Sequence, residues 1–292
     1  MYHAYAPAKL NLHLHVTGRR TDGYHLLESI IAFTDINDIL FIRPAEEGLS
    51  LNITGPFATP LLAEDTSQNI VIKAATLLAA HAGIAPHASI TLEKHIPLGG
   101  GLGGGSADAA VALHLLCTLW NLTPDTLILK QLALQLGADV PVFIERNAAF
   151  VSGIGEIIQP VFAFPPLHAV LVNPGIFLST PAVFRQGVTQ FSTPEKDIAS
   201  ICRLTDGALL AYLRCCQNDL EAPAIQLVPE IAVILADINA QPGCLLSRMS
   251  GSGATCFGIF TTFQTAAAAA ATIQAKQPAW WVQITQIKSH FA

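Results

Sequence analysis

Apolar and polar residues alternate along several short segments of the chain, which is typical of strands with one buried face. The alternation is clearest over residues 8–16, where every second side chain from Leu10 to Val16 is apolar. The intervening polar positions are Lys9, Asn11, His13 and His15. Lys9 and Asn11 are therefore expected to project from one polar face. Further strands are predicted over residues 28–43, 49–54, 89–93, 168–172, 245–249, 255–260 and 280–287.

Other segments carry apolar residues at the spacing of an α-helix. Residues 69–78 are predicted to be helical, with Ser67 as a possible cap and Gly83 beyond the end. Thr180 is expected to cap another helix, with Pro181 at its first position. The remaining predicted helices cover residues 109–120, 124–136, 206–214, 224–239 and 266–271. This mixture of strands and helices predicts an α+β architecture, with a second domain starting beyond Phe150.

The composition sets limits on the class of protein. A chain of 292 residues that is 51% hydrophobic can bury the core of one large or two ordinary domains. Its net charge of −6 argues against a nucleic-acid partner, since phosphate backbones are bound by clustered Lys and Arg. We expect no signal peptide, no membrane span and a cytoplasmic location, with the six cysteines reduced because none form a C-x-x-C pair.

The stretch Pro97–Ala107 is dominated by glycine. Six of the seven positions from Gly99 to Gly105 lack a Cβ, so the backbone there can adopt positive φ and its amides can approach a bulky anion. A predicted strand precedes the stretch and a predicted helix follows it. Strand, glycine loop and helix start together predict a phosphate-binding loop, because the first amides of a helix and its dipole both favour an anion.

Other interpretations of this loop are weaker. A Walker loop requires Lys directly after its last glycine, and Ser106 stands there instead. The spacing of Gly99, Gly101 and Gly104 satisfies the dinucleotide fingerprint, but so dense a glycine run does so by chance, and no βαβ crossover precedes it. A flexible linker is disfavoured by the adjoining strand and helix.

Several single residues each leave two interpretations open. Tyr24 and His25 lie in a polar loop that is either a plain hairpin connection or a site for a planar heterocycle. Lys94 is either a surface lysine or an ammonium placed before the glycine loop. Asp139, the one acid between residues 132 and 144, is either a helix cap or a catalytic base.

His13 and His15 are two residues apart and could in principle chelate a metal. No cysteine or carboxylate at ligand spacing accompanies them in the sequence, so ordinary sheet-face histidines are the favoured interpretation, and no metal ligand is assigned.

Taken together, these segments resemble the GHMP kinase superfamily. The resemblance is carried by segments spread over most of the chain: residues 7–12, 23–25, 97–110, 137–141, 173–175, 180–184 and 251–253, together with Asn69 and Lys94. It implies a two-domain α+β fold, with a ribosomal-protein-S5-domain-2-like half at residues 1–157 and a ferredoxin-like α/β sandwich half at 158–292. Within the superfamily, the resemblance is to members that phosphorylate a cytidine diphosphate conjugate. The residues that carry this closer resemblance are Asn11, Tyr24 with His25, and Thr180 with Phe184.

The resemblance implies transfer of the γ-phosphoryl of ATP, with Mg²⁺, to a hydroxyl of 4-diphosphocytidyl-2-C-methylerythritol in isoprenoid synthesis. Asp139 would be the base and Lys9 would orient the hydroxyl. ATP would be bound by Pro97, Leu98, Gly99, Gly100, Gly101, Leu102, Gly103, Gly104, Gly105, Ser106 and Ala107, with Asn69 and Lys94 at the base end. The conjugate would be bound by Asn11, Tyr24, His25, Thr180 and Phe184.

The resemblance also leaves departures and alternatives. Asp108 stands where many relatives carry Asn, and we expect it to turn away from the phosphates and have no site role. The chain is expected to be a monomer or weak homodimer that binds small molecules. The alternatives are a related kinase for another small alcohol, such as homoserine or mevalonate, and a nucleotide-binding regulator without turnover.

Overall fold

The computed structural model describes residues 1–188 and 190–291, and its contacts divide the chain into two units. Unit 1 comprises Met1–Ala8, Ile36–Pro97 and Gly103–Arg146. Unit 2 comprises Lys9–Asp35, Leu98–Leu102 and Asn147–Ala292. The domain boundary expected between residues 157 and 158 stays a prediction. The two units group residues that pack together, and each unit is made of several separate segments of the chain.

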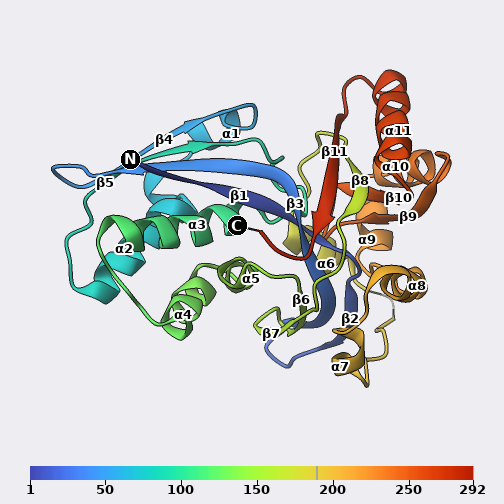
Figure 1. Cartoon of the computed structure of the whole chain (residues 1–292), viewed down its shortest axis with the longest axis horizontal. Helices are drawn as coiled ribbons and strands as arrows, with labels where there is room; N and C mark the ends of the chain where they lie inside the picture. Colours follow the sequence, from blue (N-terminus) through green and yellow to red (C-terminus); the bar gives the residue numbers. More distant parts are fainter. Residues whose placement is uncertain (189, 292) are drawn as a thin grey trace. The chain divides into compact units, whose positions relative to one another are not determined.

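Two long strands, β1 (Tyr2–Asn11) and β3 (His25–Arg43), run through both units. In unit 1, β3 pairs with β1 and lies antiparallel to β5 (Ala88–Glu93), which is parallel to β4 (Leu49–Thr54). The other elements of this unit are α1 (Thr59–Leu62), the 3₁₀ helix η1 (Thr66–Gln68), α2 (Ile70–Ala82), α3 (Gly104–Leu119), α4 (Thr126–Leu136) and α5 (Val140–Glu145). Helices α2, α3 and α4 lie on one face of the strands (Figure 1).

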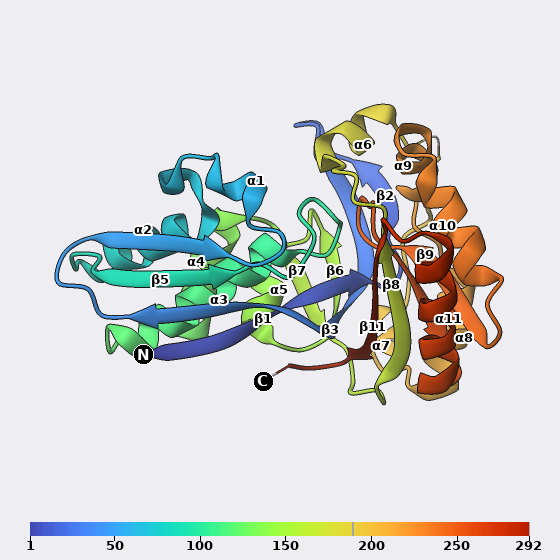
Figure 2. The ribbon, with the colours of Figure 1, turned by 90° about the horizontal axis from the view of Figure 1, so that it is seen from above.

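In unit 2, four antiparallel strands follow the order β11 (Trp281–Lys288), β8 (Leu167–Asn173), β10 (Cys256–Phe260) and β9 (Cys244–Met249). Helices α10 (Glu230–Asn239) and α11 (Phe263–Lys276) cover one face of this sheet (Figure 2). The first half of β3 pairs with β2 (His15–Arg19) and β6 (Ala149–Gly153), and β6 pairs with β7 (Ile157–Pro160). The remaining helices are α6 (Thr180–Gln186), α7 (Ile198–Ile201), α8 (Asp206–Cys215) and α9 (Glu221–Leu227).

The predicted strand over residues 8–16 is wrong in two respects. It is broken between Asn11 and His15, and its polar side is buried as deeply as its apolar side. At the break, the chain pairs with the segment after α8: Leu14 N donates to Gln217 O at 3.0 Å, and Asp219 N donates to Leu14 O at 2.8 Å. The alternation of residues along the strand does not predict a contact with this distant segment.

Several helix boundaries also differ from the prediction; α3 begins at Gly104 and not at 109, and α11 spans Phe263–Lys276 and not 266–271. The helix expected over residues 224–239 is two helices, because Pro229 starts α10 and cannot continue α9. The cap of α2 is Asn69 and not Ser67, since Asn69 Oδ1 accepts from Val71 N at 2.9 Å. Ser179, not Thr180, caps α6 by accepting from Ala182 N. Gly83 ends α2 with φ of 67°, as expected.

No helix within the described residues combines the length and apolar character that crossing a membrane requires.

Candidate active site

The glycine loop has the backbone conformation that its sequence predicts. Gly99, Gly101 and Gly103 have φ between 61° and 73°, the left-handed region that side chains disfavour. A Cβ on Gly101 would lie 2.2 Å from Ser250 O. Gly103 is the N-cap of α3, and Gly105 in the first turn is exposed. The loop therefore presents the exposed amino end of a 16-residue helix, the geometry suited to an anion.

A second glycine turn, residues 250–253, packs against the first part of this loop within unit 2. Ser250 Oγ donates to Gly101 O at 3.0 Å and accepts from Asn11 N at 3.2 Å. Thr255 N donates to Gly100 O at 3.2 Å. The sequence indicated a turn here but not its partner, and Ser250 was missed because the bond to Gly101 joins residues 149 positions apart.

Lys9 and Asn11 are both 4% exposed and lie side by side at the end of β1. Lys9 Nζ donates to Asn11 Oδ1, and Asn11 Nδ2 donates to Ser29 Oγ at 2.8 Å. Lys9 N also donates to Leu102 O at 2.9 Å, which ties this strand to the glycine loop. Asn11 thus uses its amide to hold the ammonium group of Lys9 in place.

Asp139 lies at the start of α5 in unit 1. It occupies the N-cap position, but its side chain accepts no capping hydrogen bond, so the interpretation as a helix cap fails. Residues 140–144 that follow are buried, whereas Asp139 itself is partly exposed. The role of Asp139 as a catalytic base therefore stays a prediction.

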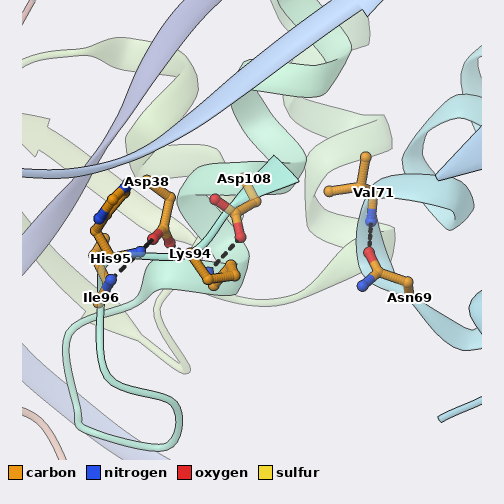
Figure 3. Close-up of polar contacts among 7 residues, drawn as sticks. All are labelled: Asp38, Asn69, Val71, Lys94, His95, Ile96 and Asp108. Atoms are coloured by element: carbon orange, nitrogen blue, oxygen red, sulfur yellow. Dashed lines mark hydrogen bonds and ion pairs between the residues drawn. The ribbon is translucent and has the colours of Figure 1, made fainter. Parts of the chain in front are cut away.

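Lys94 is neither a surface residue nor directed at solvent. Its side chain is 2% exposed, and Nζ is bound by Asp38 Oδ2 and, at 2.7 Å, by Asp108 Oδ2 (Figure 3). Asp38 Oδ1 also accepts from His95 N at 2.5 Å and from Ile96 N at 2.9 Å. We call Asp38, Lys94 and Asp108 the buried triad, which lies inside unit 1. In the sequence, Lys94 precedes the glycine loop and Asp108 follows it.

The charges of the buried triad are strongly coupled. Burial raises the pKa of Asp108 to about 7, and the attraction of Lys94 offsets this only in part because Asp38 shares the same ammonium. Burial alone would lower the pKa of Lys94, but the two carboxylates overcome it and raise that pKa. Asp108 is directed into the interior, and its lack of a site role stays a prediction.

Asn69 lies at the start of α2 in unit 1, where it is the N-cap (Figure 3). Its Oδ1 is used in capping the helix. A contact between Asn69 and a ligand stays a prediction.

Four predicted substrate residues meet in one cavity of unit 2. Tyr24, His25, Thr180 and Phe184 line a hollow of about 670 Å³ together with Arg19 and neighbouring residues of α6. Thr180 Oγ1 lies 2.7 Å from Ser252 Oγ, so this cavity is joined to the second glycine turn. The loop holding Tyr24 and His25 is therefore more than a hairpin connection, because it forms a wall of this cavity.

His25 and Phe184 stack within the cavity, with ring centroids 4.7 Å apart and planes inclined by 22°. Burial, and then the charge of Arg19, lower the pKa of His25, so its ring is neutral near pH 7. Tyr24 is 61% exposed at the rim. The cavity thus offers flat aromatic faces and a neutral hydrogen-bonding ring, which suit an uncharged heterocycle.

Two family models match the chain. The model for the GHMP kinases N terminal domain matches residues 69–146, and that for GHMP kinases C terminal matches residues 198–279. The 4-diphosphocytidyl-2-C-methyl-D-erythritol kinase of Cereibacter sphaeroides is 48% identical over 97% of this chain and 98% of its own length. The chain belongs to this family of GHMP kinases. The kinase of the same name from Paramagnetospirillum magneticum is 46% identical over the same shares of the two chains.

Solved structures agree with this family. A crystal structure of a 4-(cytidine 5'-diphospho)-2C-methyl-D-erythritol kinase superimposes with a TM-score of 0.80 at 35% identity, covering 98% of this chain and 99% of that one. A homoserine kinase from Cytophaga hutchinsonii superimposes with a TM-score of 0.74 at 18% identity, over 99% and 95%, which shows the fold alone. The expected α+β fold of a GHMP kinase is confirmed.

Proposed function

We propose that this chain transfers the γ-phosphoryl group of ATP to the 2-hydroxyl of 4-diphosphocytidyl-2-C-methyl-D-erythritol, on the non-mevalonate route to isoprenoid precursors. The observation that carries the proposal is the 48% identity, over nearly the whole chain, to a kinase named for this substrate. The aromatic cavity of unit 2 supports it, since a nucleobase conjugate needs flat apolar faces with a few hydrogen-bonding groups.

For the nucleotide, we propose that residues 97–107 wrap the phosphates. Backbone amides of the loop and of the first turn of α3 would donate to phosphate oxygens, and the Ser106 hydroxyl would add a side-chain contact. Asn69 would contact the base end. We assign Lys94 a supporting role instead of a ligand contact, because its ammonium is bound to two carboxylates inside unit 1.

The residues present fit a magnesium ion that arrives with ATP. Mg²⁺ prefers oxygen ligands and keeps several waters and phosphate oxygens, so it needs few groups from the protein. Ser106, partly exposed in the first turn of α3, is the hydroxyl we propose for it. When bound, the ion neutralises phosphate charge during transfer.

For the chemical step, we propose Asp139 as the base that accepts the proton of the acceptor hydroxyl. Its partial exposure and its failure to cap α5 support this role. Lys9 would orient the hydroxyl, and its positive charge would favour the ionised form of the base. Asn11 would act through Lys9, because its amide is already bound to Lys9 and Ser29.

For the acceptor, we propose that Tyr24 and Phe184 enclose the cytosine and that His25 and Thr180 hydrogen bond to the substrate. The stack of His25 on Phe184 shows that one face of Phe184 accepts a flat ring. The base would then meet the remaining aromatic surface at the rim, where Tyr24 is exposed.

A coupled ADP-release assay tests the proposal, with the cytidine diphosphate conjugate, homoserine and mevalonate supplied as separate acceptors. We expect turnover with the conjugate alone. Turnover with homoserine or mevalonate would assign the chain to another GHMP activity. ATP binding without ADP release on any acceptor would favour the alternative of a nucleotide-binding regulator without turnover. We further propose that the protein works in the cytoplasm without a nucleic-acid or membrane partner.

A further inference from the structure

Two histidines and a cysteine distant from them in the sequence meet inside unit 2, and none of the three is assigned to catalysis. His13 lies between β1 and β2, His15 begins β2, and Cys216 follows α8. One potential ligand atom from each lies within 4.8 Å of those of the other two. Among the described residues, this is the one group of three or more His, Cys, Asp or Glu side chains that could hold a metal ion.

The histidine nitrogens of this cluster lack the partners that buried polar atoms require. His13 is fully buried, yet neither of its ring nitrogens has a hydrogen-bond partner within the described chain. His15 Nε2 accepts from Gln217 N at a long 3.4 Å, and its Nδ1 is buried and unpartnered. Buried polar groups are nearly always satisfied, so three orphaned nitrogens beside one thiol point to a missing ligand.

We propose that His13, His15 and Cys216 bind a zinc ion. Two imidazoles and one thiolate are a typical zinc donor set, with Zn–N of about 2.0 Å and Zn–S of about 2.3 Å. Donors around one tetrahedral ion are therefore ~3.5 Å apart, and the cluster reaches this by small side-chain movements. On binding, the Cys216 thiol loses its proton to solvent as the Zn–S bond forms.

The surrounding charges can accommodate this ion. Asp219 and Glu195 both lie within electrostatic range of His15. Arg248 is the opposing charge, and its guanidinium is held by backbone carbonyls, including Leu12 O at 2.6 Å and Leu213 O at 2.9 Å. Replacing the thiol proton with Zn²⁺ adds one positive charge. The two carboxylates together balance this charge and the charge of Arg248.

The cluster also has a route for entry and a candidate for the fourth ligand position. Cys216 and Arg248 border a cavity of about 430 Å³ in unit 2, which adjoins the aromatic cavity at Gly187 and Val188. The hydroxyl of Tyr212 lies near Cys216 but donates to Glu195 Oε1 at 2.8 Å. The fourth position of a tetrahedral ion is therefore left to water.

Zinc at this place would join the start of β2 to the end of α8. His13 O also accepts from Ser29 Oγ at 2.5 Å, and Ser29 is the residue that holds Asn11. The ion would therefore brace the backbone that continues from Lys9 and Asn11, without touching a substrate. Its role is structural, and its loss should lower stability before it alters the chemistry.

The test uses the full chain, made metal-free with a chelator and titrated with Co²⁺ as a spectroscopic substitute for Zn²⁺. We expect one equivalent of Co²⁺ to give a thiolate-to-cobalt charge-transfer band and the intense visible bands of a tetrahedral site. Cys216→Ser should abolish the charge-transfer band and weaken binding by at least about tenfold. The neighbouring Cys215→Ser is the matched control and should behave as wild type, because Cys215 is exposed and outside the cluster.

Near-UV circular dichroism checks whether both variants are folded. Thermal unfolding supplies a second measurement of metal binding. Zn²⁺ should raise the melting temperature of wild type and Cys215→Ser but not of Cys216→Ser. If wild type develops no charge-transfer band, or Cys216→Ser keeps it, the proposal is wrong and the histidines are simply unsatisfied core residues. If Cys216→Ser is unfolded, His15→Gln replaces it and must lose the visible tetrahedral bands for the proposal to stand.

Discussion

The carboxyl group of Asp108 shares one ammonium with Asp38, and this arrangement makes stability depend on pH. Folding raises its pKa from 3.8 to about 7, so the folded chain binds this proton more tightly than the unfolded chain does. Stability from this group is therefore present at low pH and falls as the pH rises from about 4 to about 7. Asp108→Asn should remove this dependence, because Asn can still accept from Lys94 but does not ionise.

Thermal unfolding across this pH range checks the prediction. The melting temperature of Asp108→Asn should exceed that of wild type by a margin that grows with pH, on the order of a few degrees. Asp35→Asn is the control, since Asp35 forms an exposed pair with Lys288. Parallel curves for wild type and Asp108→Asn would show that Asp108 does not hold its proton in the folded state.

Asp139 is the residue on which the proposed chemistry depends. Asp139→Asn should lower kcat by roughly 10²–10⁴, with the Kd for ATP little changed, because a general base is lost while the nucleotide site is retained. Steady-state kinetics and ATP titration measure the two quantities. Glu47→Gln, which neutralises an exposed acid of the same unit, is the control. A kcat near that of wild type would remove Asp139 from the mechanism.

Tyr24 tests the proposed binding of a nucleobase. Tyr24→Ala should raise the KM for the cytidine diphosphate conjugate by about tenfold, since stacking on a base contributes about 1–3 kcal/mol, and should leave the KM for ATP unchanged. Tyr5→Ala removes a similarly exposed ring from unit 1 and should change neither value. An unchanged KM for the conjugate in Tyr24→Ala would favour an acceptor without a base.

At the scale of elements, two positions of the glycine loop should tolerate side chains very differently. A Cβ on Gly101 would overlap Ser250 O at 2.2 Å, and its φ of 73° costs about 1–2 kcal/mol for other residues. Gly101→Ala should therefore raise the KM for ATP at least about tenfold. Gly105→Ala should be tolerated, because its nearest neighbour would be Ile70 Cγ2 at 3.9 Å. Kinetics with ATP compare the two, and equal effects would contradict the packing of the turns.

Local patterns predicted most elements well, and failed where a distant segment intervened. The long strand β3, the end of α2 at Gly83 and the strands β8, β9, β10 and β11 follow from alternation, helical spacing and glycine punctuation. Strand β6 and helix α5 were not predicted, because β6 is specified by pairing with β3 and α5 is a short buried helix. The break between β1 and β2 depends on residues 217–219, about two hundred positions away.

At the scale of the whole molecule, we predict a monomer or weak homodimer. Exposed large apolar side chains are spread over both units, among them Tyr5, Leu62, Phe162 and Phe177. Scattered residues of this kind do not require a partner, and the net charge of −6 opposes association. Sedimentation velocity over a range of concentrations should give a monomer or a dimer that dissociates on dilution. A dimer that persists at every concentration would contradict this prediction.

The sequence by itself determined the glycine loop and the family and proposed the candidate site residues, because glycine density and local spacing act over a few neighbouring positions. Only the tertiary structure decided which groups are accessible and which are paired. Lys94 is bound to two carboxylates, Asn11 holds Lys9, and Ser250 supports the glycine loop. Cys216 likewise joins His13 and His15 only in the folded chain. Such contacts depend on long-range packing, and no local pattern of residues specifies them.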